Sequence, residues 1–139
     1  MAAMDAGTRT PDGTVRGLPL VLLRSEGAAL LGLAIVLYAK FGRSWILFAV
    51  LLLAPDLGAL GYVRDTRIGA MTYDLVHTYL PPAILGAIGV LADNSLMWSV
   101  AIIWFGHIGM DRLVGFGLKY PDSFKHTHLG WMGRGDHAA

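Results

Sequence analysis

The chain contains no cysteine, and its 139 residues carry a formal net charge of only +1. Without cysteine there is no disulfide, no thiolate metal site and no catalytic thiol. A net charge so close to zero is unlike the basic surface of nucleic-acid-binding proteins, so we expect no nucleic-acid partner. The sequence also lacks internal repeats, and it is too short for the inverted-repeat plan of secondary transporters.

Apolar residues, in contrast, are abundant. Hydrophobic residues make up 55% of the chain, whereas soluble domains use about 45–50%. The first 17 residues, MAAMDAGTRTPDGTVRG, lack the basic-then-apolar order of a secretory signal. We therefore expect residues 1–17 to form a retained, disordered tail, and the apolar run that follows to be a permanent membrane span.

Four stretches are long enough to cross a bilayer as helices, which takes roughly 20 mainly apolar residues. These stretches are residues 18–39, 44–63, 68–92 and 95–118. The short links between them favour antiparallel neighbours. Backbone groups in lipid must be hydrogen-bonded within the protein, which favours helices. The predicted fold is an all-α, four-helix transmembrane bundle over residues 18–118, followed by a C-terminal tail, residues 119–139.

Lysine and arginine in the flanks of the spans predict their orientation. One side of the membrane would hold Arg9, Arg16, Arg64, Arg67, Lys119, Lys125 and Arg134. The opposite side would hold only Lys40 and Arg43. This asymmetry predicts that both termini are cytoplasmic, in a multi-pass protein of the bacterial cytoplasmic (inner) membrane.

Several ionisable residues lie inside the predicted spans, where each costs at least about 2.5–3.5 kcal/mol at mid-depth. They are Asp56, Asp74, His77, His107 and Asp111, and the predicted orientation places all of them in the cytoplasmic half of the bundle. Residues three or four apart share a helix face, which pairs Asp74 with His77 and His107 with Asp111. The pattern predicts one polar pocket that opens to the cytoplasm.

Prolines stand beside two of these positions. Pro55 precedes Asp56, and Pro81-Pro82 follows His77. Because proline removes a backbone donor and kinks a helix, we expect bends that widen the bundle near the pocket.

Histidine nitrogens together with carboxylate oxygens suit a divalent metal such as zinc, manganese or iron. The candidate ligands are Asp56, Asp74, His77, His107, Asp111 and, from the HTH motif of the tail, His128. Of these, His77, His107 and Asp111 are the candidate catalytic residues, as ligands or as general bases. Arg112 and Lys125 are candidates for binding an anionic headgroup. The structural alternative is that His107 with Asp111, and Asp74 with His77, are hydrogen-bonded pairs that only fix the helices.

Three motifs carry a family resemblance: LLAPDLGALGYV, GAMTYDLVHTYLPPAILG and WFGHIGMDRLVGFGLKYPDSFKHTHLG. Together they resemble domain-of-unknown-function family 4260, small bacterial integral membrane proteins, over about residues 20–134. The resemblance implies a four-helix membrane protein and no activity. A more distant likeness, through Pro55-Asp56, His77, His107 and the HTH tail, is to membrane-bound metal-dependent hydrolases.

Two functional hypotheses follow. In the first, the pocket holds a divalent metal ion and hydrolyses a lipid-like substrate. In the second, the chain is a non-catalytic accessory subunit that packs against other membrane subunits or against copies of itself, and the polar residues hold the helices together. Membrane lipids are partners in both. The first requires the histidines and an aspartate to converge on a common point, whereas the second expects separate pairs and a stripe of small residues facing outward.

Overall fold

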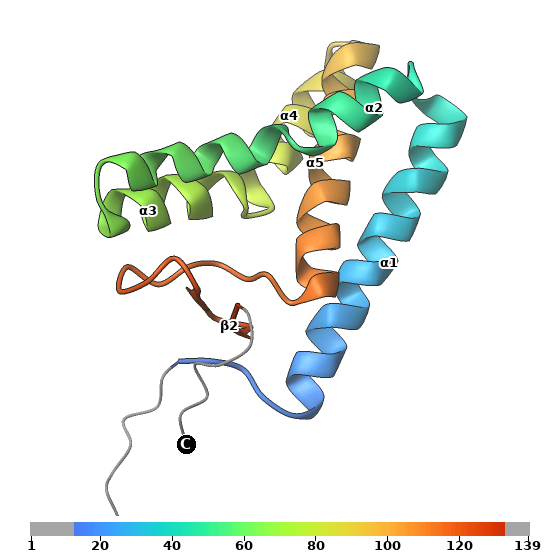
Figure 1. Ribbon diagram of the computed structural model, residues 1–139. Coiled ribbons are helices and arrows are strands. Elements are labelled where there is room, and N and C mark those ends of the chain that lie inside the picture. Colours follow the sequence, from blue (N-terminus) through green and yellow to red (C-terminus); the bar gives the residue numbers. More distant parts are fainter. Residues whose placement is uncertain (1–12, 133–139) are drawn as a thin grey trace, which may run out of the picture.

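The structure, a computed structural model, describes residues 13–132 and is mostly helical (Figure 1). Its elements are α1 (Leu18–Phe41), α2 (Trp45–Leu52), the 3-10 helix η1 (Ala54–Val63), α3 (Thr66–Val76), α4 (Leu80–Leu91), α5 (Ser95–Val114), β1 (His126–Thr127) and β2 (Gly130–Trp131). Within the described residues the only sheet is the small antiparallel pair of β1 and β2, which confirms the helical fold class. Most of the predicted N-terminal tail, and residues 133–139, lie outside the described part.

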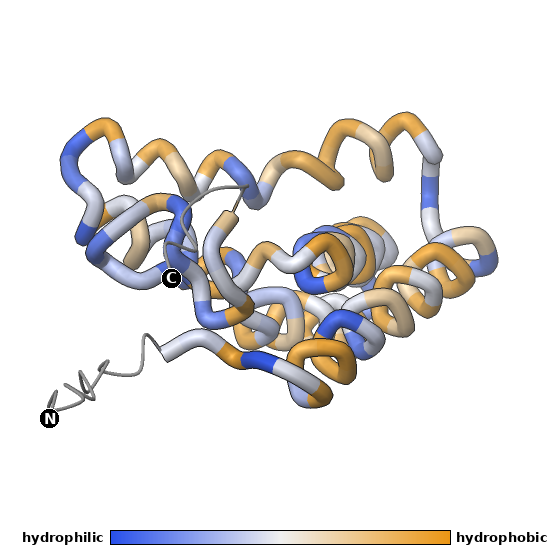
Figure 2. Tube along the Cα trace, turned by 60° about the horizontal axis from the view of Figure 1, so that its bottom comes forward, coloured by the Kyte–Doolittle hydropathy of each residue, from blue (hydrophilic) through white to orange (hydrophobic). Residues whose placement is uncertain are grey.

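Among residues 13–132, three segments are long and apolar enough to cross a membrane: Leu18–Phe41, Trp45–Val63 and Thr66–Leu91. Figure 2 shows the apolar stretches along the helices, and hydrophilic residues in the links and the C-terminal segment. The fourth predicted span, α5, is not among the three. It carries more buried residues than any other described helix, because the other elements surround it.

Two of the predicted spans are bent. The second changes from α2 to η1 at Leu53, just before Pro55, and the third is interrupted between α3 and α4 at residues 77–79, just before Pro81. The bends lie where the prolines predict them. In Figure 1, η1 and α3 pack side by side and run sideways from α5, whereas α4 turns to pack along α5. The bundle is therefore less regular than four straight antiparallel helices.

Side-chain caps fix the links between the helices. Ser44, Asp65 and Asn94 each accept hydrogen bonds from backbone N–H groups in the first turn of α2, α3 and α5, as expected of residues that favour N-caps. Helix α5 ends at Val114 rather than at Leu118, because Gly115 adopts a left-handed conformation with φ of 94°.

Helices α1 and α5 pack closely through glycines. A Cβ atom on Gly109 would lie 2.8 Å from the carbonyl oxygen of Gly27 and 2.9 Å from the backbone nitrogen of Leu31. A Cβ atom on Gly27 would meet the carbonyl oxygen of Gly109 at 2.7 Å. Small residues that let two backbones approach are typical of membrane helix pairs. This contact holds the polar end of α5 against α1.

The C-terminal segment, residues 115–132, folds back over α3 instead of leaving the helices as a free tail (Figure 1). The backbone N–H of Lys119 donates a 2.6 Å hydrogen bond to Asp74 Oδ1. The side chain of Lys119 is buried, donates to the carbonyl oxygen of Phe124 at 2.8 Å, and lies over the rings of Tyr73 and Phe124. The N-terminal segment joins this layer through Val15, whose N–H donates to the carbonyl oxygen of His128.

We predict that Gly109→Ala and Gly32→Ala change stability in opposite directions. Gly32 lies in the same kind of helix interior, but a Cβ atom there would meet nothing within 4 Å. Alanine is the better helix former by about 1 kcal/mol, so Gly32→Ala should raise the melting temperature in detergent. Gly109→Ala should lower it, because the new methyl group meets backbone atoms of α1. Equal shifts in both variants would contradict the close α1–α5 contact.

We also predict that Asp74→Ala loosens the C-terminal segment. A hydrogen bond to a charged group contributes about 1.5–3 kcal/mol, and this variant removes the bond that anchors Lys119. Limited proteolysis in detergent should then cleave within residues 115–132 faster than in the wild type. Glu26→Ala, which removes an exposed carboxylate from α1, is the control and should leave the cleavage rate unchanged. An unchanged rate in Asp74→Ala would show that other contacts anchor the segment.

Candidate metal centre

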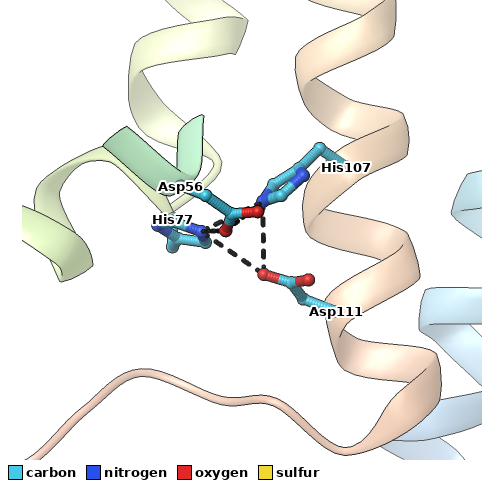
Figure 3. Close-up of side chains that lie close together, drawn as sticks. All are labelled: Asp56, His77, His107 and Asp111. Carbon is cyan, nitrogen blue, oxygen red and sulfur yellow. Dashed lines mark hydrogen bonds and ion pairs between the residues drawn. The ribbon is translucent and has the colours of Figure 1, made fainter. Parts of the chain in front are cut away.

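Four polar side chains meet where the two bent spans touch α5 (Figure 3). Asp56 lies in the first turn of η1, and His77 is the C-cap residue of α3. His107 and Asp111 lie one turn apart on α5 and point to the same side. Each of the four residues offers one ligand atom, and these atoms all lie within 4.8 Å of one another. Both helix breaks therefore deliver a ligand to the same point.

The distances between the four groups are short and similar. The Nε2 atoms of His77 and His107 are 3.0 Å apart. Asp111 Oδ2 lies 3.3 Å from each of these nitrogens. Asp56 Oδ1 lies 3.5 Å from His77 Nε2 and 3.4 Å from His107 Nε2. The residues thus form one cluster rather than two separate pairs.

Backbone carbonyl groups fix the tautomer of both histidines. His77 Nδ1 is 2.8 Å from the carbonyl oxygen of Tyr73, and His107 Nδ1 is hydrogen-bonded to the carbonyl oxygen of Leu52. Because a carbonyl oxygen only accepts, each Nδ1 must carry the proton. In the neutral imidazole each Nε2 then presents a lone pair to the cluster. A second hydrogen bond of this kind is the usual support of metal-binding histidines.

Two imidazole lone pairs and two carboxylates at one point concentrate negative potential, so the cluster needs a positive charge. Either a proton on an imidazole or a metal ion supplies it. Four ligand atoms around a tetrahedral zinc ion, at about 2.0–2.1 Å from it, are about 3.3–3.4 Å apart. The five separations that involve an imidazole nitrogen, between 3.0 and 3.5 Å, are compatible with that geometry, and the two carboxylate oxygens lie within 4.8 Å of each other.

The members of the cluster differ in exposure. The side chains of His77, His107 and Asp111 are 1%, 0% and 7% exposed, whereas that of Asp56 is 52% exposed. The Tyr73 ring stacks on His77, and its hydroxyl donates to Asp111 Oδ2 at 3.3 Å. Three of the groups are therefore rigidly enclosed, and the fourth faces the outside.

The broken end of α3 is stabilised by side chains of α5. The indole Nε1 of Trp104 donates to the carbonyl oxygen of Val76 at 2.7 Å, and Arg112 donates to the carbonyl oxygen of His77 at 3.0 Å. The last carbonyl groups of a helix have no N–H partner within the helix. The side chains of Trp104 and Arg112 supply these missing donors. They also fix the backbone that carries His77.

The structure does not bring every predicted site residue to the cluster. Asp74 accepts from the backbone of Lys119, and His128 Nδ1 accepts from the N–H of Leu118. Both residues therefore position the C-terminal segment. Arg112 donates to two backbone carbonyl groups and is buried. Lys125 is exposed on the C-terminal segment.

Burial and charge shift the pKa of two groups in that segment. Burial lowers the pKa of Lys119 to about 8, against the opposing effect of the nearby aspartates. Burial, together with the positive charge of Arg112, also lowers the pKa of His128. A neutral His128 is the form that accepts the Leu118 hydrogen bond, so both shifts agree with a structural role for the segment.

The sequence indicates only one of the supporting residues. The 73/77 spacing predicts that Tyr73 shares a helix face with His77, and the ring of Tyr73 stacks on His77. Trp104 shares a face of α5 with His107, but its contact with Val76, like that of His107 with the carbonyl group of Leu52, exists only because α3 and α2 end there.

The comparisons with known proteins agree with the motifs. A sequence family described as Domain of unknown function (DUF4260) matches residues 20–132. No curated protein and no solved structure is significantly similar to the chain. The matched region contains all four residues of the cluster. Because the match extends over most of the sequence, the chain belongs to the DUF4260 family.

Proposed function

We propose that the cluster of Asp56, His77, His107 and Asp111 binds a divalent metal ion and hydrolyses a lipid-like substrate at the surface of the bacterial inner membrane. The observation that carries the proposal is the convergence of two Nε2 lone pairs and two carboxylate oxygens within 4.8 Å. The lysine and arginine distribution favours a cytoplasmic position for the cluster.

The difference in exposure suggests a division of roles. His77, His107 and Asp111 are enclosed and supported by hydrogen bonds, so they are the permanent ligands. Catalytic metal sites typically have three protein ligands and keep one position open. Asp56, whose side chain is 52% exposed, is the least enclosed of the four, so we assign it to the open position as a proton acceptor rather than as a fourth ligand. It therefore acts as the general base.

The reaction is hydrolysis of an ester. His77, His107 and Asp111 would hold the metal ion, which would act as a Lewis acid and lower the pKa of a water molecule toward neutrality. Asp56 accepts a proton from this water, whose oxygen attacks the acyl carbon. The bond from the acyl carbon to the alkoxy oxygen breaks, and the alcohol leaves with the proton that Asp56 returns. The products are a carboxylic acid and an alcohol.

The accessory-subunit hypothesis receives less support. It expects separate polar pairs, whereas the four groups lie together. It also expects small residues in an outward stripe, whereas Gly27 and Gly109 face each other between α1 and α5. In that hypothesis a shared proton, rather than a metal ion, holds the cluster together. The elemental analysis described below would then find no metal.

We predict that the protein purified in detergent contains about one equivalent of zinc, manganese or iron by elemental analysis. His77→Gln and His107→Gln should each lose it, because a glutamine amide is a poor replacement for an imidazole. Loss of a supporting partner alone weakens metal sites by about 10- to 100-fold, so loss of a ligand should cost more. His128→Gln is the matched control and should keep the metal.

A metal-free wild type that also fails to bind added Zn²⁺, Mn²⁺ or Fe²⁺ in calorimetry would contradict the proposal. Binding lost equally in His128→Gln would contradict the assignment of ligands.

We further predict that Asp56→Asn separates metal binding from turnover. The variant should retain its metal, since three ligands remain. Its kcat for 4-nitrophenyl acyl esters should fall by about 100-fold or more, the usual contribution of a general base. The KM should change little. Complete loss of the metal would instead make Asp56 a permanent ligand.

A further inference from the structure

A second feature lies directly beside the cluster. It is a cavity of about 270 Å³ between η1, α3 and α5, and its walls include Leu51, Pro55, Leu57, Val76, Val100 and Trp104. None of the cluster residues lines it. The cavity is therefore a separate space that shares walls with the candidate metal centre.

The apolar walls of the cavity favour a hydrocarbon occupant. All of its lining residues are apolar apart from the indole N–H of Trp104, and that group is already bonded to the carbonyl oxygen of Val76. An apolar cavity with no free polar partner does not hold ordered water. An occupant would have to be a chain or ring without polar groups, at least over the part that enters.

The lining residues connect the cavity to the ligands. Pro55 precedes Asp56, Val76 precedes His77, and Trp104 lies three residues before His107 on the same face of α5. Part of the cavity wall is therefore the same backbone that carries Asp56 and His77. Leu57, which directly follows Asp56, is 65% exposed and belongs to the apolar segment Trp45–Val63. In a membrane, the cavity mouth at Leu57 would therefore face hydrocarbon.

We propose that this cavity binds the acyl chain of a membrane lipid ester, so that the ester group lies at the cluster. The chemical part of this inference rests on the proposed hydrolase function, whereas binding of the chain does not. The chain enters from the bilayer past Leu57, and its carbonyl end stops beside Asp56. The substrate class is thereby an acyl ester with a single apolar tail.

A larger apolar groove on the opposite face of α5 serves as an internal control. Its volume is about 570 Å³, and it is lined by residues of α1, α4 and α5 that include Leu33 and Phe105. No cluster residue lines this groove. A tail bound there would not place an ester near the candidate ligands.

The test uses a lysophospholipid that carries a photoreactive diazirine in its acyl chain, added to the full-length protein in detergent. Peptide mapping should place the adducts on residues 51–58, 76 and 100–104. Val100→Phe fills the cavity and should reduce these adducts about tenfold or more, since one methylene group in an apolar pocket already changes selectivity about 10-fold. Leu33→Phe, in the larger groove, should leave them unchanged.

Metal content is measured on the same preparations. If Val100→Phe loses its metal through misfolding, Leu57→Trp, at an exposed position of the cavity mouth, replaces it. Cavity adducts in a metal-free wild type would overturn the proposed hydrolysis and support the acyl site. Adducts that are spread over the outer helix faces would contradict the binding of an acyl chain in the cavity. So would adducts that neither cavity variant reduces in a metal-containing protein. Neither result would contradict the metal centre.

Discussion

The arrangement depends on two backbone carbonyl groups that lie at the ends of helices α2 and α3. The carbonyl oxygen of Leu52, at the end of α2, accepts from His107, and that of Tyr73, in the last turn of α3, accepts from His77. These two hydrogen bonds force both imidazoles to present Nε2 to the same point. Irregular backbone at membrane depth is tolerated only where it is buried in protein or lines a cavity, and here it orients the ligands.

The buried polar side chains of helix α5 explain why the other elements surround it. This helix carries His107, Asp111 and Arg112, all of them buried, and such residues are costly when they face lipid. Helix α1 shields one side through the Gly27–Gly109 contact, and η1 and the end of α3 bring the other two residues of the cluster. The C-terminal segment covers α3 from below in Figure 1. The described helix with the most buried ionisable side chains is thus the central one.

Much of this could be predicted from the sequence. Apolar length predicts the helical segments, the prolines predict the bends, and the 107/111 spacing predicts that one histidine and one aspartate share a face. The sequence could not show that Asp74 turns toward Lys119. Its distance of three residues from His77 places both on one face of a continuous helix, but α3 ends at Val76 and His77 has left the helical conformation. The sequence could not predict the fold of the C-terminal segment either, because backbone groups take part in the hydrogen bonds that hold this segment in place. The cytoplasmic orientation stays a prediction.

The cluster lies between two different environments, and this position constrains its chemistry. Asp56 is exposed on one side, while the cavity behind Pro55 and Val76 is apolar. A fully water-soluble substrate would gain nothing from that cavity, and a pure hydrocarbon would have no group to offer the ligands. A molecule with one apolar tail and one polar head satisfies both sides at once. A tail that comes from the bilayer is already out of water, so the hydrophobic effect would add little to its binding. The cavity would instead determine where the polar head of such a molecule lies.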